Sequence, residues 1–316
     1  MTRLLVCRFA QRGRLVPALA AAALLAACGE VTPGPGFEHY AAAPTAARLV
    51  EVLDGKPDAE RRRLLVRALE LHGIPYRKLA YTAATGPGTN IEIELGGGAP
   101  ALIVAAHYDR VAESGGANDN ASCVAAAIDV YRAVAAAGAP KNISLKVVFF
   151  DDEENGLAGS RHYAATAAPD TIAGVVSLEL CGIGDAFGIW DIHRGMEDSL
   201  IVRALRAAGK ATGVYAGVHG PVPRFSSDHW NFLERGIPAV GLTVLPRADE
   251  AALRAYVADP NSLRWLLRWM RPTIFRTYHT ASDSAETVEA SALAMVARVV
   301  ARAVGEADSL MRTNKE

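Results

Sequence analysis

Short apolar runs alternate with longer stretches of helical periodicity along most of this chain. The apolar runs occupy residues 91–95, 101–109, 144–150, 172–180 and 238–245. A strand that is buried on both faces is apolar at nearly every position, so these runs predict a largely parallel sheet. The Ala-rich stretch 121–137 and the amphipathic stretch that follows Pro57 predict helices between the strands. The pattern therefore predicts an α/β fold in three layers, with helices on both faces of a central sheet.

The first 27 residues have the layout of a signal peptide. Several arginines precede an apolar stretch from Leu15 to Ala27, and a cysteine follows at Cys28. The tetrapeptide 25–28 (LAAC) resembles a bacterial lipobox, which makes Cys28 the predicted lipidation site and mature N-terminus. A short membrane anchor and an ordinary cleaved signal remain as alternatives, and each of these layouts predicts export.

The predicted location is the cell envelope. Gly29, rather than Asp, follows the cysteine, and by resemblance to bacterial lipoproteins this favours anchoring to the outer membrane. The other locations that export allows are the periplasm and the medium. We expect contact with the membrane through the lipid anchor only.

The remainder of the chain is predicted to form one domain after a short tether. Residues 31–36 (VTPGPG) are rich in Pro and Gly, so we assign 28–39 as a tether and 40–316 as a single catalytic domain. Residues 246–277 follow the last predicted strand and are interpreted as an insertion or lid. The body contains two cysteines, Cys123 and Cys181, and the pattern leaves open whether they pair or are buried thiols.

Composition narrows the class of function. The chain has 316 residues, of which 51% are hydrophobic, and a formal net charge of −1. It can therefore bury a sizeable core, and it lacks the positive charge expected of a nucleic-acid-binding protein. No nucleic-acid partner is predicted.

Ionisable side chains stand where the predicted strands end. His107 and Asp109 close one apolar run, the acidic residues 151–154 close the next, and Glu179 closes a third. The carboxyl ends of parallel strands meet at one edge of a sheet, so these side chains should converge. Several carboxylates share a pocket at low cost only when a cation neutralises them. The pattern predicts a divalent metal site.

Five ordered motifs carry a resemblance to a known family. They are His-x-Asp (107–109), Asn-Asp-Asn-Ala-Ser (118–122), Glu-Glu-x-Gly-Leu-x-Gly-Ser (153–160), Ser-Asp-His (227–229) and Tyr-His-Thr (278–280). In this order they resemble the M28 zinc peptidases, over roughly Ala101 to Val300. The resemblance implies a mixed eight-stranded sheet between helices, and an aminopeptidase that acts on peptides with a free N-terminus.

The resemblance also implies a set of metal ligands. His107 and Glu179 would bind one zinc ion, Glu154 and His279 the other, and Asp119 would bridge them. Imidazoles and carboxylates are ordinary zinc ligands, and a bridging carboxylate suits a pair of ions.

Further roles follow from the same motifs. Asp109 would accept the second N–H of the first histidine and fix its tautomer. Glu153 would act as general base and then as general acid. Arg224, Asp228 and Tyr278 are candidate substrate-binding residues.

Two features leave alternatives open within this assignment. The family usually has Asp where this chain has Glu179, which is one methylene longer, so we expect two zinc ions and keep a single-zinc enzyme as the alternative. In the acidic run 151–154, composition alone does not choose the ligand. The alignment with the Gly-Leu-x-Gly-Ser stretch at 156–160 makes Glu154 the ligand.

Two rival functions are retained. One is a single-zinc glutaminyl-peptide cyclotransferase, a related group that the segments 159–162 and 228–236 also resemble. That group has Trp where this chain has Tyr278, and a longer insertion after the acidic pair. The other rival is a surface-tethered binding module without activity, because fold does not guarantee catalysis. All ligand positions and Glu153 hold competent residues here, which favours an enzyme.

Overall fold

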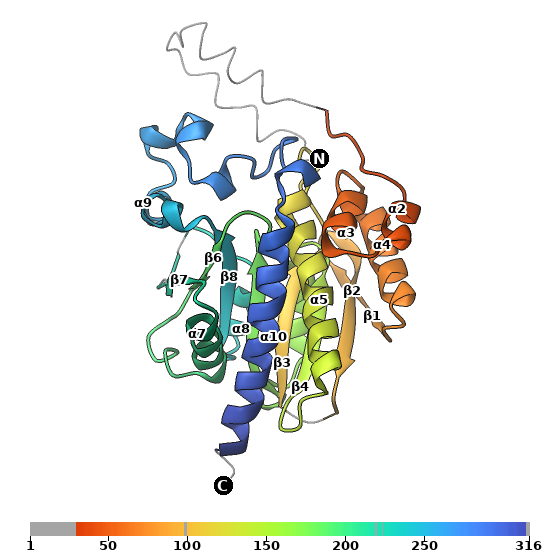
Figure 1. Ribbon diagram of the computed structural model, residues 1–316, viewed down its shortest axis with the longest axis vertical. Coiled ribbons are helices and arrows are strands. Elements are labelled where there is room, and N and C mark those ends of the chain that lie inside the picture. The colour runs from red at the N-terminus through yellow and green to blue at the C-terminus, as the bar shows by residue number, and fades with distance from the viewer. Residues whose placement is uncertain (1–29, 98–99, 219, 223, 314–316) are drawn as a thin grey trace, which may run out of the picture.

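The computed structural model describes residues 30–97, 100–218, 220–222 and 224–313, and a mixed sheet forms its middle layer (Figure 1). The eight strands lie in the order β1-β2-β4-β3-β5-β8-β6-β7. They are β1 (Arg77–Ala83), β2 (Gly86–Leu95), β3 (Ala101–His107), β4 (Ser144–Phe150), β5 (Ile172–Glu179), β6 (Ala186–Trp190), β7 (Tyr215–Val218) and β8 (Ala239–Leu245). The central strands β4, β3, β5 and β8 are parallel. Antiparallel pairs join β1 to β2, β2 to β4 and β8 to β6.

Helices cover both faces of this sheet. One face carries α3 (Ala46–Leu53), α4 (Asp58–Leu71), α5 (Ser122–Ala137), α7 (Leu200–Thr212) and α10 (Ala290–Thr313), and the other carries α6 (Ala158–Thr166) and α8 (His229–Leu233). Figure 1 shows α5 and α10 side by side in front of the central strands, where they pack on each other. The predicted three-layer α/β fold with a mixed, mostly parallel sheet is confirmed.

The remaining elements are short. They are α2 (Phe37–Ala42), the π-helical turn η2 (Ala117–Ala121), α9 (Glu250–Ala258), and the 3₁₀ turns η3 (Pro169–Thr171), η4 (Arg247–Asp249), η5 (Leu263–Trp265), η6 (Arg268–Met270), η7 (Thr273–Phe275) and η8 (Ala285–Thr287). The predicted insertion thus contains α9 and several separate 3₁₀ turns. Helix α2 begins at Phe37, inside the stretch predicted as a tether, and the Phe37 side chain is buried.

Burial explains why some strands were visible in the sequence and others were not. Strands β3 and β8 are buried at every residue, so their sequences are apolar at nearly every position. Strand β1 lies at the edge and exposes most of its side chains, while β6 and β7 are only 5 and 4 residues long. These three strands were not predicted, because edge position and short length remove the apolar run.

Membrane-related features of the sequence lie mostly beyond the described residues. The signal segment and Cys28 fall among the residues that the structure leaves undescribed. Within the described part of the chain, no helix combines the length and the apolar character needed to cross a membrane.

The loop between β5 and β6 approaches the end of β8 closely, and this approach gives a test of the fold. Gly184 has φ +128°, and a Cβ there would lie 2.1 Å from the carbonyl carbon of Leu245. Gly213, which ends α7, has φ +72° and open space around the same position. We expect Gly213→Ala to lower the free energy of unfolding by about 1–2 kcal/mol, through backbone strain alone. Gly184→Ala should cost about 3 kcal/mol or more, because steric overlap adds to the strain. Urea unfolding of both variants measures the difference, and equal losses would contradict the described approach of the two segments.

Candidate metal centre

The predicted site residues converge at one edge of the sheet. His107 is the last residue of β3 and Glu179 the last of β5, while Glu153 and Glu154 follow β4 directly. The three strands are parallel neighbours, so their carboxyl ends meet. Asp119 reaches the same place from the turn η2, which precedes α5.

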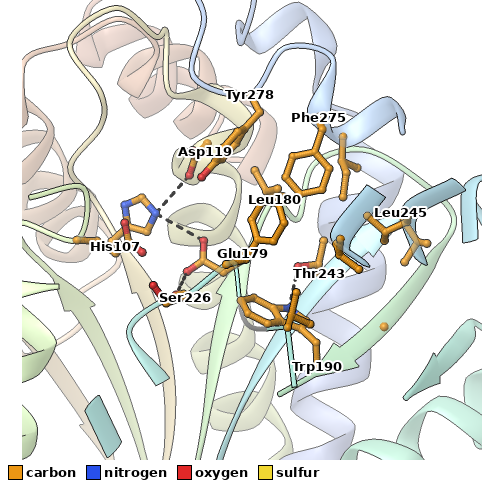
Figure 2. A pocket seen from close by; sticks show the side chains of 18 residues that line it. His107, Asp119, Glu179, Leu180, Trp190, Ser226, Thr243, Leu245, Phe275 and Tyr278 are labelled. Carbon is orange, nitrogen blue, oxygen red and sulfur yellow. Dashed lines mark hydrogen bonds and ion pairs between the residues drawn. The ribbon is translucent and has the colours of Figure 1, made fainter. Parts of the chain in front are cut away.

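Asp119 lies between two imidazoles. Its Oδ1 is 3.3 Å from Nε2 of His107, and its Oδ2 is 3.2 Å from Nε2 of His279. A second carboxylate lies against each histidine, with Glu179 Oε2 3.6 Å from His107 and Glu154 Oε2 3.3 Å from His279. Figure 2 shows the first of these halves, with His107 between Asp119 and Glu179. The result is two clusters of one imidazole and one carboxylate, joined by a shared carboxylate.

The donor atoms are spaced closely enough to share an ion. Possible ligand atoms of His107, Asp119 and Glu154 lie within 4.8 Å of one another, and those of His107, Glu153 and Glu179 form a second such group. Imidazole nitrogen together with carboxylate oxygen is a donor set suited to zinc. Nε2 of His279 is buried and makes no well-aligned hydrogen bond, although carboxylate oxygens lie 3.2 and 3.3 Å from it. The described residues therefore fit a metal centre.

The charges of the site are poorly balanced by protein groups. Burial opposes the charge on His107, but the carboxylates of Glu153 and Glu179 raise its pKa well above the ordinary value. Burial also opposes the charge on His279, but its two carboxylate partners raise its pKa to about 9. Burial raises the pKa of Glu153 well above its usual range. These three shifts favour the protonated forms of His107, His279 and Glu153, as clustering and burial of carboxylates predict.

Two acidic side chains contact the candidate ligands or the backbone that carries them. Asp109 Oδ1 is 3.3 Å from Nδ1 of His107, and its Oδ2 accepts the backbone N–H of Glu154 at 3.0 Å. Asp283 accepts the backbone N–H groups of Asn118 at 2.7 Å and Asp119 at 3.1 Å. Asp109 thus contacts both halves of the site, and its orienting role stays a prediction. Asp283 fixes the turn that carries the shared carboxylate.

The turn at 117–121 is also tied to the end of β5. Gly182 donates its N–H to Asn118 Oδ1 at 2.7 Å, and Asn120 donates to the carbonyl of Leu178 at 2.9 Å. Ser122 accepts the N–H of Cys181 at 3.1 Å. These bonds set the position of Asp119 relative to Glu179.

Sequence reasoning missed two supporting residues. Ser227 donates a hydrogen bond to Oε1 of Glu179, which leaves Oε2 facing His107. The Ser-Asp-His motif includes Ser227, but the motif alone does not say which carboxylate it contacts. Asp283 lies four residues after His279, and that spacing gives no sign that it binds the turn at Asn118.

The remaining predicted residues differ in their positions. Tyr278 lies in the site wall with its ring stacked on His279, at a centroid distance of 3.8 Å. Asp228 is fully buried, and burial raises its pKa to about 8 even though the charge of His107 opposes the rise. Arg224 is exposed, and its neighbours Val222 and Phe225 line the site instead.

An apolar cavity opens beside the metal centre. Its wall includes Leu180, Trp190, Phe225, Leu253, Phe275 and Tyr278, and it also contains His107, Asp119, Glu153 and Glu179. Figure 2 shows the aromatic rings of this wall on the side of Glu179 away from His107. The segment 246–277 supplies Leu253 and Phe275, so the predicted insertion forms part of the wall.

The two body cysteines are both buried as free thiols. Cys123 lies in α5, and Cys181 lies just after β5. Burial raises the pKa of the Cys123 thiol well above its usual value. A buried thiol that is held protonated behaves as a small apolar group.

The chain is similar to known sequences of one peptidase family. Residues 90–304 match the sequence profile described as Peptidase family M28. The leupeptin-inactivating enzyme 1 of Streptomyces exfoliatus is 26% identical over 247 residues, which cover 75% of this chain and 52% of that protein. The probable lipoprotein aminopeptidase LpqL of Mycobacterium tuberculosis is 27% identical over 245 residues, covering 68% of this chain and 44% of its own length. The chain thus spans about half the length of these curated relatives.

Solved structures show the same fold. BSAP, a zinc aminopeptidase from Bacillus subtilis, matches with a TM-score of 0.56 and 22% identity, over 71% of this chain and 51% of that one. A glutaminyl cyclase from Porphyromonas gingivalis matches with a TM-score of 0.63 and 20% identity, over 84% of this chain and 98% of that one. At these identities the likeness establishes the fold alone. The family profile covers more than half of the chain, and the chain belongs to peptidase family M28.

Proposed function

We propose that this chain is a zinc-dependent aminopeptidase, which hydrolyses the peptide bond next to a free N-terminal amine. The observation that carries the proposal is the position of Asp119, with one carboxylate oxygen against each of two imidazoles. Two metal ions held about 3.5–4 Å apart by a bridging carboxylate are typical of aminopeptidase sites. The name of LpqL, a probable lipoprotein aminopeptidase, supports this choice within the family.

Five residues would hold the metal ions. His107 and Glu179 would bind one ion, Glu154 and His279 the other, and Asp119 both, as the distances between these side chains allow. Zinc bound there lowers the pKa of a water ligand and polarises a carbonyl oxygen. The longer side chain of Glu179 is held by Ser227, so it still reaches the side of His107.

Glu153 is the proton carrier in this mechanism. Its carboxylate belongs to the same close cluster as His107 and Glu179, and it also lines the cavity where the substrate would lie. It accepts a proton from the attacking water as the new carbon–oxygen bond forms. It then donates that proton to the amine nitrogen as the carbon–nitrogen bond breaks, so one side chain acts as base and then as acid.

The cavity defines a substrate class. Its wall beside Glu179 is formed by apolar and aromatic side chains, among them Leu180, Trp190 and Phe225. Transfer of an apolar N-terminal side chain from water into such a space lowers the free energy of binding. A charged side chain would lose its hydration there without gaining a polar partner. The acidic residues of the centre attract the free amine of the substrate. We therefore infer a preference for peptides that begin with a large apolar residue.

Anchoring to the cell envelope is part of the same proposal. The LAAC sequence at 25–28 and the Pro/Gly tether after it support acylation at Cys28. One relative carries the word lipoprotein in its name. A peptidase tethered in this way would act on peptides outside the cytoplasm.

The first prediction concerns activity and specificity. The purified chain should release arylamine from Leu-arylamide with a kcat/KM about 100-fold above that for Glu-arylamide, because the apolar wall stabilises only the former. N-acetyl-Leu-arylamide should not be cleaved, a chelator should abolish turnover, and added zinc should restore it. Pyroglutamate formation from an N-terminal glutaminyl peptide, without arylamine release, would assign the cyclotransferase function instead. Bound zinc without turnover of any of these substrates would indicate a binding module.

A second prediction separates the two adjacent glutamates. Glu153→Gln should lower kcat by about 10²–10⁴-fold with zinc content unchanged, because the amide cannot accept a proton. Glu154→Gln should lower zinc affinity, thermal stability and activity together, because it removes a charged ligand. Asp152→Asn alters the same acidic run and should leave both zinc content and kcat near wild type. Zinc analysis and kinetics of the three variants give the assignment. Loss of zinc in Glu153→Gln, with retention in Glu154→Gln, would exchange the two roles.

A third prediction concerns the N-terminal cysteine. In cells that process lipoproteins, Cys28→Ser should abolish incorporation of a labelled fatty acid, because the acyl group requires that thiol. Cys7→Ser, the matched control, should leave incorporation unchanged. Label retained in Cys28→Ser would refute the lipoprotein proposal.

A further inference from the structure

A group of large apolar side chains is exposed on the segment after α9. Leu263 is 80% exposed, Leu266 71% and Trp269 67%, and the exposed Leu267 and Met270 belong to the same eight residues. We call residues 263–270 the outer patch. Isolated exposed apolar residues are ordinary, but a contiguous group usually marks a binding surface.

The outer patch rests on a packed base. Between its exposed members, Trp265 is only 2% exposed and packs edge-on against Tyr256, at a centroid distance of 5.4 Å. The Trp265 indole donates to the carbonyl of Asp259 at 3.0 Å, and Arg271 donates to the carbonyl of Trp265 at 3.1 Å. Because the indole of Trp265 occupies the inner side, its neighbours are directed outward.

The segment that carries the outer patch is rich in arginine, and exposed Asp259 borders it. From Pro260 to Ser282 the chain contains no Asp or Glu and four arginines, at positions 264, 268, 271 and 276. Arg264, Arg268 and Arg276 are exposed. Interleaved arginine, leucine and tryptophan is the composition of segments that lie in the interface of an anionic membrane. Tryptophan is enriched at the level of lipid headgroups.

The same charge disfavours a second copy of this chain as the partner. A two-fold interface centred on the outer patch would place the arginines of one copy against those of the other. Like charges facing each other across an interface cost free energy. An anionic lipid surface complements both the arginines and the apolar side chains.

The place of the outer patch in the fold agrees with a membrane partner. Figure 1 shows the segment after α9 at the same end of the molecule as the start of the described chain, and away from the C-terminal end of α10. A surface that meets this end of the domain would also be near the tether. The sequence predicts contact with the membrane through the lipid anchor only, and docking through the outer patch would add a second contact.

We propose that the outer patch, which includes Arg264, and the nearby Arg276 dock the domain on a membrane surface rich in anionic headgroups. Leu266 and Trp269 enter the boundary between headgroups and acyl chains, and the arginines pair with the lipid phosphates. This docking is separate from the peptidase chemistry and does not depend on it.

Vesicle binding of the full chain tests the docking. The chain carries Cys28→Ser in every sample, so that no acyl group contributes, and the vesicles are phosphatidylcholine with or without phosphatidylglycerol. Binding should be stronger with phosphatidylglycerol, and Arg264→Gln with Arg276→Gln should weaken that binding about 30-fold, from two lost arginine contacts. Arg203→Gln with Arg298→Gln removes two exposed arginines from α7 and α10 and should have no such effect.

Tryptophan quenching identifies the side chain that enters the bilayer. Brominated acyl chains should quench the fluorescence of the bound chain, and Trp269→Phe should remove most of that quenching. Trp230→Phe, which changes an exposed tryptophan on α8, should leave it unchanged. Equal quenching in both variants, or equal affinity for both kinds of vesicle, would overturn the proposal. So would a stable dimer in sedimentation that Leu266→Ser converts to monomer.

Discussion

The burial of several carboxylates around one imidazole is the constraint on which the site depends. Asp109, Asp119, Glu179 and Asp228 are all buried near His107, and Glu153 lies beside them. Burial opposes the charged form of a carboxylate, and it raises the pKa values of Glu153 and Asp228. A divalent cation bound by several carboxylate oxygens offsets the free-energy cost of burying their charges. The same arrangement that is unfavourable as bare protein is therefore favourable as a metal centre.

The sheet turns this constraint into a defined geometry. Three parallel strands end beside one another. Their ends bring together His107, the acidic pair after β4, and Glu179, which are far apart in the sequence. Asp119 lies in a turn, and a turn lacks the hydrogen bonds between strands that would fix the position of its residues. Its position is instead set by hydrogen bonds to Asp283 and by the links between that turn and the end of β5. Strand pairing thus positions one set of groups, and buried side-chain hydrogen bonds position the other.

The sequence was informative wherever burial imposes a pattern. Strands β3, β4, β5 and β8 are apolar at most positions because both faces are covered, and the ionisable residues that end β3 and β5 belong to the centre. Strands β1, β6 and β7 gave no such pattern, since they are exposed or short. The contacts of Asp283 and Ser227, and the cavity wall, depend on which distant segments meet. No local pattern encodes that meeting, so they required the structure.

The segment 246–277 serves two surfaces because it is folded around its own small core. Tyr256, Trp265 and Phe275 pack together, with ring centroids of Tyr256 and Phe275 4.7 Å apart. On the inner side Phe275 lines the cavity, and on the outer side Leu266 and Trp269 are exposed. A close-packed core transmits displacement more readily than a loose loop does. A membrane bound to the outer side would therefore restrict the motion of the inner wall. The same three aromatic rings would then influence both the docking of the domain and the shape of its cavity.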